Sequence, residues 1–116
     1  MEPNIRIPVD ITKAQYLVTS NTGPKIADRR TGVQKIDKKT ELPMWVTELT
    51  QISAKGGARV LQVTTLSETQ PALSIGETVV PEGLEAMPWE SKDNDTGATR
   101  FGIAYRADVL RVAVTA

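Results

Sequence analysis

The sequence predicts an all-β protein, a small antiparallel barrel or sandwich of five to six strands. Three observations predict this class. Short blocks of strand-favouring residues recur along the 116 residues, with turn residues between them. No segment carries a sustained apolar stripe at the 3.6-residue period of a helix. The length suits one domain, spanning residues 1–116, in which closure of the sheet hides the strand edges.

The N-terminal third contains two predicted strands and a long polar segment. Residues 5–9 alternate around Arg6 and Pro8 and predict an edge strand, where proline is tolerated. Residues 15–20 predict the second strand. Residues 21–42, which we call the basic arm, are rich in polar residues, and we expect a projecting segment that either forms a flexible hairpin or stays mobile.

The central hairpin is the clearest element of the sequence. Residues 44–52 and 59–66 both alternate between the two faces of a strand. Lys55-Gly56-Gly57 lies between them, and paired glycines supply the positive φ values of a tight turn. These runs predict an antiparallel hairpin.

The following segment contains a proline and many acidic residues. Residues 77–80 predict a short strand that Pro81 stops, and residues 83–87 continue it after a kink. Residues 88–98 predict a polar acidic loop.

The C-terminal segment, residues 99–114, returns to a β-rich composition. It contains Phe101, Ile103 and Tyr105, followed by a run of alternating apolar residues. A short helix over residues 104–110 is the competing interpretation of part of this segment.

Composition excludes several function classes. The chain has no cysteine and no histidine, so serine–histidine and cysteine–histidine nucleophiles are excluded. We expect no enzyme, no cofactor and no metal site. No stretch reaches the roughly 18 apolar residues of a membrane span, and the N-terminus lacks the pattern of a signal peptide. We therefore expect a cytoplasmic protein that has no membrane partner.

The charges are balanced in number but not in position. Fourteen basic and fourteen acidic residues give a net charge of zero. The basic arm carries Lys25, Arg29, Arg30, Lys35, Lys38 and Lys39, whereas residues 68–95 are mostly acidic. This layout indicates a chain that holds phosphates with one surface. Ordinary charge clustering on solvated loops is the alternative.

Cations beside exposed aromatic rings are typical of sites for single-stranded nucleic acid. Trp45 follows the basic arm directly, and Phe101 lies between Arg100 and Gly102 in a predicted turn. A core position is the alternative for both rings, and Trp89, in the acidic part, is expected to pack or to bind a partner protein. The candidate nucleic-acid-binding residues are Lys25, Arg29, Arg30, Lys35, Lys38, Lys39, Trp45, Arg59, Arg100 and Phe101.

Several short motifs occur in a familiar order. They are Ile5-Arg6-Ile7, Lys13-Ala14-Gln15-Tyr16, Thr65-Leu66-Ser67-Glu68-Thr69-Gln70-Pro71-Ala72 with Gly76, Phe101-Gly102, and Asp108-Val109-Leu110-Arg111-Val112. In this order the chain resembles the single-stranded-DNA-binding proteins of filamentous phages, of the gene V type. It also resembles small regulatory proteins of actinobacterial integrative plasmids.

The resemblance implies an OB-fold, a homodimer, and cooperative, largely sequence-independent binding of single-stranded DNA, with RNA as the alternative ligand. By position, the family's basic loop falls on the basic arm and its tip aromatic on Phe101. The chain departs from the family in its longer arm and acidic connection, and in Val109, where the family has an arginine. The implied role is replication or transfer of a phage or mobile element.

Two other functions remain open. A protein-interaction module would use the acidic segment to bind a replication initiator protein, and zero net charge favours it. A structural role in a virion is the remaining interpretation.

Overall fold

The protein is built from strands, as the sequence predicts. The computed structural model describes residues 5–113. Its elements are β1 (Ile7–Pro8), the 3-10 turn η1 (Ile11–Lys13), β2 (Ala14–Val18), β3 (Gly23–Pro24), β4 (Ile26–Asp28), β5 (Val33–Gln34), β6 (Met44–Ser53), β7 (Ala58–Leu66), β8 (Thr78–Glu82), β9 (Glu85–Lys92), β10 (Thr99–Arg106) and β11 (Val109–Val112). The described residues contain no helix that is long and apolar enough to cross a membrane.

The strands outnumber the predicted five to six. Two long strands are each broken once, β8 from β9 at Gly83-Leu84 and β10 from β11 at Ala107-Asp108. Gly83 has a φ of 69°, a left-handed value that interrupts extended backbone. The basic arm adds the short strands β3, β4 and β5, which composition does not reveal.

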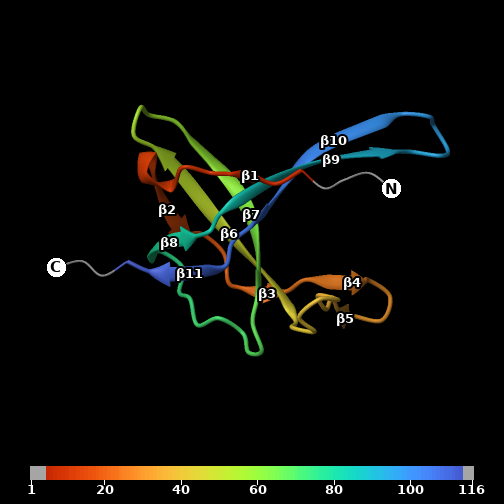
Figure 1. The fold of residues 1–116 in the computed structure, drawn as a ribbon, viewed down its shortest axis with the longest axis horizontal. Helices are drawn as coiled ribbons and strands as arrows, with labels where there is room; N and C mark the ends of the chain where they lie inside the picture. Colours follow the sequence, from red (N-terminus) through yellow and green to blue (C-terminus); the bar gives the residue numbers. More distant parts are fainter. Residues whose placement is uncertain (1–4, 114–116) are drawn as a thin grey trace.

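The main sheet curls into an open half-barrel (Figure 1). Its strand order is β1-β9-β10-β7-β6-β2-β8-β11, and β3 pairs with β6. Strands β7 and β10 are parallel, joined by the pairs Val63–Tyr105 and Thr64–Arg106. Strands β4 and β5 form a separate antiparallel pair.

The core lies on the inner face of the curled sheet. Alternation puts Thr47 and Leu49 of β6 and Leu61 and Val63 of β7 on this face, where all four are buried. The other buried apolar side chains come from β2, β8, β10 and the connections near them: Tyr16, Val18, Val79, Leu84, Tyr105, Ala107 and Leu110.

The structure confirms the predicted central hairpin. Strands β6 and β7 pair from Met44–Leu66 to Ile52–Ala58. Gly56 and Gly57 in the turn have φ values of 93° and 91°. The edge strand near the N-terminus is also confirmed, because β1 pairs with the outer side of β9.

The prediction that Pro81 stops a strand is wrong. β8 runs through Pro81, which is buried and lies opposite Leu110 of β11. On its other side, β8 pairs with β2 through Thr78 and Val79. Pro81 lies beyond that pairing, so β2 needs no N–H donor from it.

The predicted acidic loop over residues 88–98 is also wrong in its extent. β9 continues to Lys92 and pairs with β10 in an unbroken register, from Glu85–Arg106 to Lys92–Thr99. The turn is confined to residues 93–98. The competing helix over residues 104–110 is wrong as well, because β10 continues to Arg106 and β11 begins at Val109.

Two hairpins leave the half-barrel on the same side, as Figure 1 shows. One is the β4–β5 part of the basic arm. The other, which we call the β9–β10 arm, is the ribbon of residues 85–106. Between them, Lys25 of the basic arm reaches Thr64 of β7, which pairs with Arg106 at the end of β10.

Candidate nucleic-acid interface

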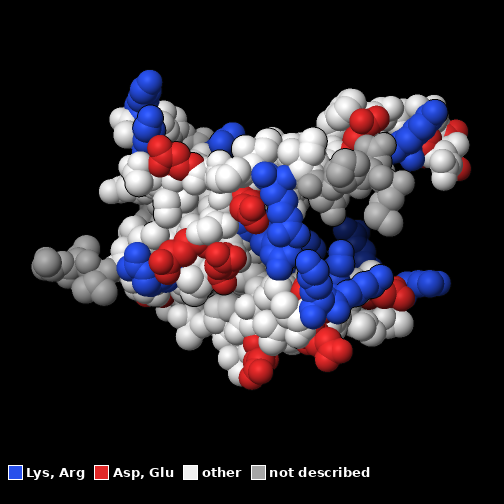
Figure 2. All heavy atoms as spheres, in the orientation of Figure 1, with Lys and Arg blue, Asp and Glu red and all other residues white. Residues whose placement is uncertain are grey.

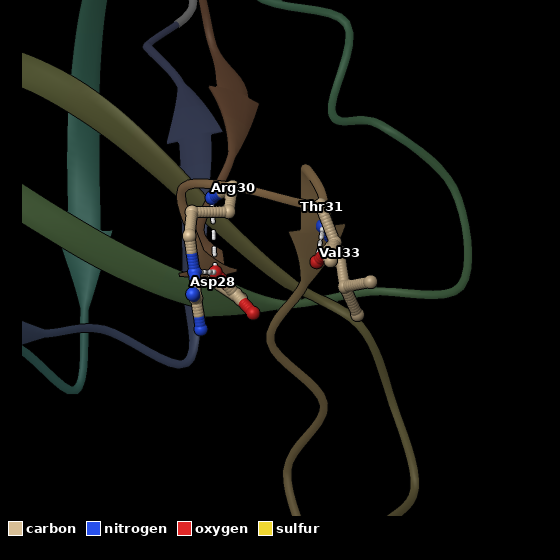
Figure 3. Close-up of polar contacts among 4 residues, drawn as sticks. All are labelled: Asp28, Arg30, Thr31 and Val33. Carbon is tan, nitrogen blue, oxygen red and sulfur yellow. Dashed lines mark hydrogen bonds and ion pairs between the residues drawn. The ribbon is translucent and has the colours of Figure 1, made fainter.

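Local hydrogen bonds order the hairpin of the basic arm (Figure 3). Asp28 Oδ1 accepts a 2.9 Å bond from the Arg30 backbone N–H, and the Arg30 Nε atom lies 3.9 Å from the same oxygen. The Thr31 hydroxyl oxygen accepts a longer bond, 3.4 Å, from the Val33 N–H. Gly32 closes the turn with a φ of 73° and donates to the Asp28 carbonyl at 2.9 Å. Within residues 21–42, β4 and β5 pair as a short hairpin.

A second turn brings the arm back to the barrel. Asp37 Oδ2 accepts bonds from the Thr40 N–H at 2.9 Å and the Thr40 hydroxyl at 2.8 Å. The Lys35 N–H donates to the Lys25 carbonyl at 2.7 Å, and the Met44 N–H donates to the Lys35 carbonyl at 2.9 Å. This network holds Lys25 and Lys35 side by side at the start of β6.

Three cations meet at this point, and we call them the basic cluster: Lys25, Lys35 and Arg106. The Lys25 Nζ atom donates to the Thr64 hydroxyl at 3.3 Å, and Thr64 is the strand partner of Arg106. The pKa of Lys25 is lowered, mainly by partial burial and then by the charges of Lys35 and Arg106. The cluster therefore joins both arms to β7.

The cations of the basic cluster have no carboxylate partner among residues 5–113. The ion pairs of these residues lie elsewhere, at Arg6–Glu85, Arg30–Asp28 and Arg111–Glu82. Asp37 is the acidic group that Arg106 influences: the pKa of Asp37 is lowered mainly by its bonds from Thr40, with a smaller contribution from Arg106. Converging cations repel one another, so an anion that binds among them is stabilised.

Figure 2 shows Lys and Arg side chains gathered in the middle of the molecule and along the basic arm. Acidic side chains are scattered in the same view. Within residues 68–95, Glu82 is paired with Arg111 and Glu85 with Arg6. The aspartates of this segment, Asp93 and Asp95, lie apart at the tip of the β9–β10 arm.

The outer face of β6 and β7 continues from the basic cluster. It presents polar side chains, among them Gln62, which donates to Glu48 at 3.3 Å. The Glu48 carboxylate also accepts a 2.8 Å bond from the Thr19 hydroxyl. This face therefore offers hydrogen-bonding groups beside the cations. Glu48 is the acidic residue of the face.

The two faces of the β9–β10 arm differ. Directly opposed residues of antiparallel strands share a face, and faces alternate along each strand. Trp89 opposes Gly102, so it lies on the face of Arg100 and Arg106. Phe101 lies on the opposite face with Ile103, which continues inward to buried Tyr105.

The structure brings some predicted site residues together and separates others. Lys25 and Lys35 join Arg106, while Arg29, Arg30, Lys38 and Lys39 lie exposed on the turns of the basic arm. Arg100 and Phe101 are neighbours in sequence but point to opposite faces of β10.

Trp45 and Arg59 are not part of the basic cluster. Trp45 shares the inner face of β6 with Thr47, is half-buried, and donates its indole N–H to the Ser67 carbonyl at 2.9 Å. Arg59 donates to Gln51 at 2.8 Å near the β6–β7 turn. It is five residues, or roughly 17 Å, from Thr64 along β7.

Two residues of this surface, Arg106 and Trp89, were not among the predicted ones. The alternation of side chains along a strand over residues 99–106 predicts that Arg106 and Arg100 lie on the same face. Arg106 and Lys25 approach each other at Thr64 from segments 81 positions apart, which a local pattern cannot reveal. No family model, curated protein or solved structure matches the chain.

Proposed function

We propose that the protein binds single-stranded DNA, largely independently of sequence, through the surface between its two arms. The observation that carries this proposal is the convergence of Lys25, Lys35 and Arg106 without a carboxylate partner in the described residues. Each phosphate that a cation neutralises releases counterions, which favours binding. Because the net charge is zero, binding depends on this local concentration of cations.

We further propose that the half-barrel is of the OB type. The strand order supports this proposal: β2, β6 and β7 pair in succession, β8 pairs with β2, and β10 runs parallel to β7. OB barrels bind oligonucleotides on strands two and three and on the loops between strands one and two and strands four and five. In this order, those loops correspond to the basic arm and to the tip of the β9–β10 arm.

An unpaired strand suits this surface better than a duplex. Single strands present base faces that stack on aromatic rings, and the β9–β10 arm exposes two such rings, Trp89 and Phe101. The resemblance to gene V-type proteins extends the proposal to a homodimer that acts in replication or transfer of a phage or mobile element. RNA is the alternative ligand.

Fluorescence anisotropy with a labelled dT oligonucleotide, compared with a duplex of equal length, tests the proposal. We expect tighter binding of the single strand and a linear fall of log affinity with log salt. Replacing Lys25 and Lys35 with glutamine reduces the magnitude of that slope by about 1.4, at about 0.7 per phosphate contact. The matched control, Lys13→Gln with Lys55→Gln, removes equal charge from exposed sites near the β6–β7 turn and leaves the slope unchanged. Absence of binding at low salt would contradict the proposal.

A protein-interaction module is the second candidate function. The apolar face of the β9–β10 arm favours it, because Phe101 is 74% exposed, Ile103 53% and the adjacent Ile7 47%. Such a face suits the binding of a partner protein, and a replication initiator is the candidate partner. Recovery of the same partner from nuclease-treated lysate by the wild type, but not by Phe101→Ala, would support this function over the first.

A further inference from the structure

We propose that Trp89, and not Phe101, is the aromatic residue that stacks on a base of the bound strand. This inference rests on the proposed function and deepens it, because it assigns the base contact to one face of the β9–β10 arm. The sequence gives no reason to prefer Trp89, since its neighbours in the chain are Pro88 and Glu90.

The register of the arm determines which aromatic ring faces the cations. Gly102 opposes Trp89 and Arg106 opposes Glu85 without a bulge between the two pairs. Trp89, Gly102 and Arg106 therefore share one face. Four residues separate Gly102 from Arg106, about 13 Å along the strand. Arg100 lies on the same face toward the tip, so cations flank Trp89 on both sides. Glu85 is also on this face, opposite Arg106, and its carboxylate is paired with Arg6 at 3.9 Å.

Gly102 provides the seat for the Trp89 ring. A Cβ atom at position 102 would overlap the Cζ2 and Cε2 atoms of Trp89, so the indole lies against the glycine backbone. Glycine in a strand often marks such a close approach. Trp89 is nevertheless 46% exposed. The ring is thus fixed by the backbone on one side and open on the other, as a stacking platform requires.

Phe101 has a different environment. It is 74% exposed, but its direct cross-strand neighbour is Glu90, whose carboxylate repels a polyanion. Lys92 is the cation on this face, two pairs nearer the tip. The face continues to Ile103 and the core, away from the basic cluster.

The test uses a 12-residue dT oligonucleotide and the full chain. We expect Trp89→Ala to weaken binding about 10- to 100-fold, Trp89→Phe to retain most of the affinity, and Phe101→Ala to stay within about 3-fold of the wild type. Gly102→Ala keeps the indole but displaces it, and we expect an intermediate loss. Urea unfolding of each variant verifies that it is folded.

A spectroscopic measurement makes the inference independent of these affinities. In a Trp45→Phe variant, Trp89 is the one tryptophan of the chain, and stacking of a base quenches its fluorescence. Unquenched fluorescence on saturation with dT, or a loss of affinity with Phe101→Ala but not with Trp89→Ala, would overturn the assignment. If the wild type itself fails to bind dT, the proposed function fails; if it binds and Trp89 does not respond, only this inference fails.

Discussion

The two arms reach the same surface by different physical means. The basic arm is ordered by side-chain-to-backbone bonds within its turns, at Asp28 and Asp37. The β9–β10 arm is ordered by eight directly opposed residue pairs and by packing such as that of Trp89 on Gly102. The comparison teaches that local polar bonds can shape the turns of the basic arm, whereas orienting an aromatic ring requires a register between strands.

The arms also differ in how they join the half-barrel. The basic arm follows β3, which pairs with β6, and Lys25 reaches across to Thr64. The β9–β10 arm meets β7 through Tyr105 and Arg106 at the end of β10. The basic cluster lies at both junctions, so a change in either one affects it.

The largest expected effect comes from the junction of the β9–β10 arm. Tyr105→Ala removes a buried ring beside Val63, and we expect the free energy of unfolding to fall by about 3–5 kcal/mol. Ile103→Ala, two residues away on the same face but 53% exposed, is the control, with an expected loss below about 1 kcal/mol. Urea unfolding measures both. Equal losses would mean that the arm is not fixed by packing at Tyr105.

A smaller effect is expected in the turn of the basic arm. Asp28→Ala removes the side-chain bond from the Arg30 N–H and keeps the backbone bond from Gly32, and we expect local opening to become easier by about 0.5–1.5 kcal/mol. Hydrogen exchange of the Arg30 amide reports this directly, since that N–H donates to Asp28. Thr31→Ala loses a bond of 3.4 Å and should change exchange by a few tenths of a kcal/mol at most. A larger change in hydrogen exchange with Thr31→Ala than with Asp28→Ala would show that the strands, and not the Asp28 bonds, hold the hairpin.

The basic cluster should make stability depend on pH in one direction. The pKa of Lys25 in the folded state is below the ordinary 10.5, so its charged form is disfavoured on folding. This cost is fully present at neutral pH and disappears as pH rises through the folded pKa toward 10.5. Relative to Lys25→Met, the wild type should gain stability as the pH rises from 7 to 10. If the difference in the free energy of unfolding between the wild type and Lys25→Met stayed constant with pH, that result would contradict the convergence of cations.

The last effect is on binding and concerns the anion beside the basic cluster. Glu48 lies on the outer face of β6, where its carboxylate accepts bonds from Thr19 and Gln62. Glu48→Gln keeps the size of the side chain and removes the charge, so we expect dT binding to tighten about 2- to 5-fold at low salt. Glu77→Gln, on the far side of β2, is the control and should leave the affinity unchanged. Weaker binding by Glu48→Gln would place the strand elsewhere.

Some of the fold follows from local pattern. The alternation of residues 44–52 and 59–66 and the paired glycines Gly56 and Gly57 predict the central hairpin, because each signal is local. Residues 88–92 were misinterpreted because proline and charged residues favour loops, whereas pairing with β10 satisfies their backbone. The prediction for Pro81 is wrong because β2 pairs with β8 only through Thr78 and Val79, and the local sequence does not show where that pairing ends.

The candidate site was less predictable than the fold. Cations of the basic arm are visible in the composition, and Lys25 and Lys35 were among the predicted residues. Their meeting with Arg106 depends on the parallel pairing of β7 and β10, which no local signal carries. The faces of Trp89 and Phe101 depend on the register of the arm, because a shift of one residue exchanges them.

An NMR titration with dT tests the central claim most directly, because the chain has two tryptophans in different places. Trp89 lies on the face of the basic cluster, and Trp45 lies on the inner face with its indole N–H bonded to the Ser67 carbonyl. We predict that the indole N–H signal of Trp89 shifts on binding while that of Trp45 stays in place. A shift of Trp45 with no change at Trp89 would contradict a single-strand interface between the two arms.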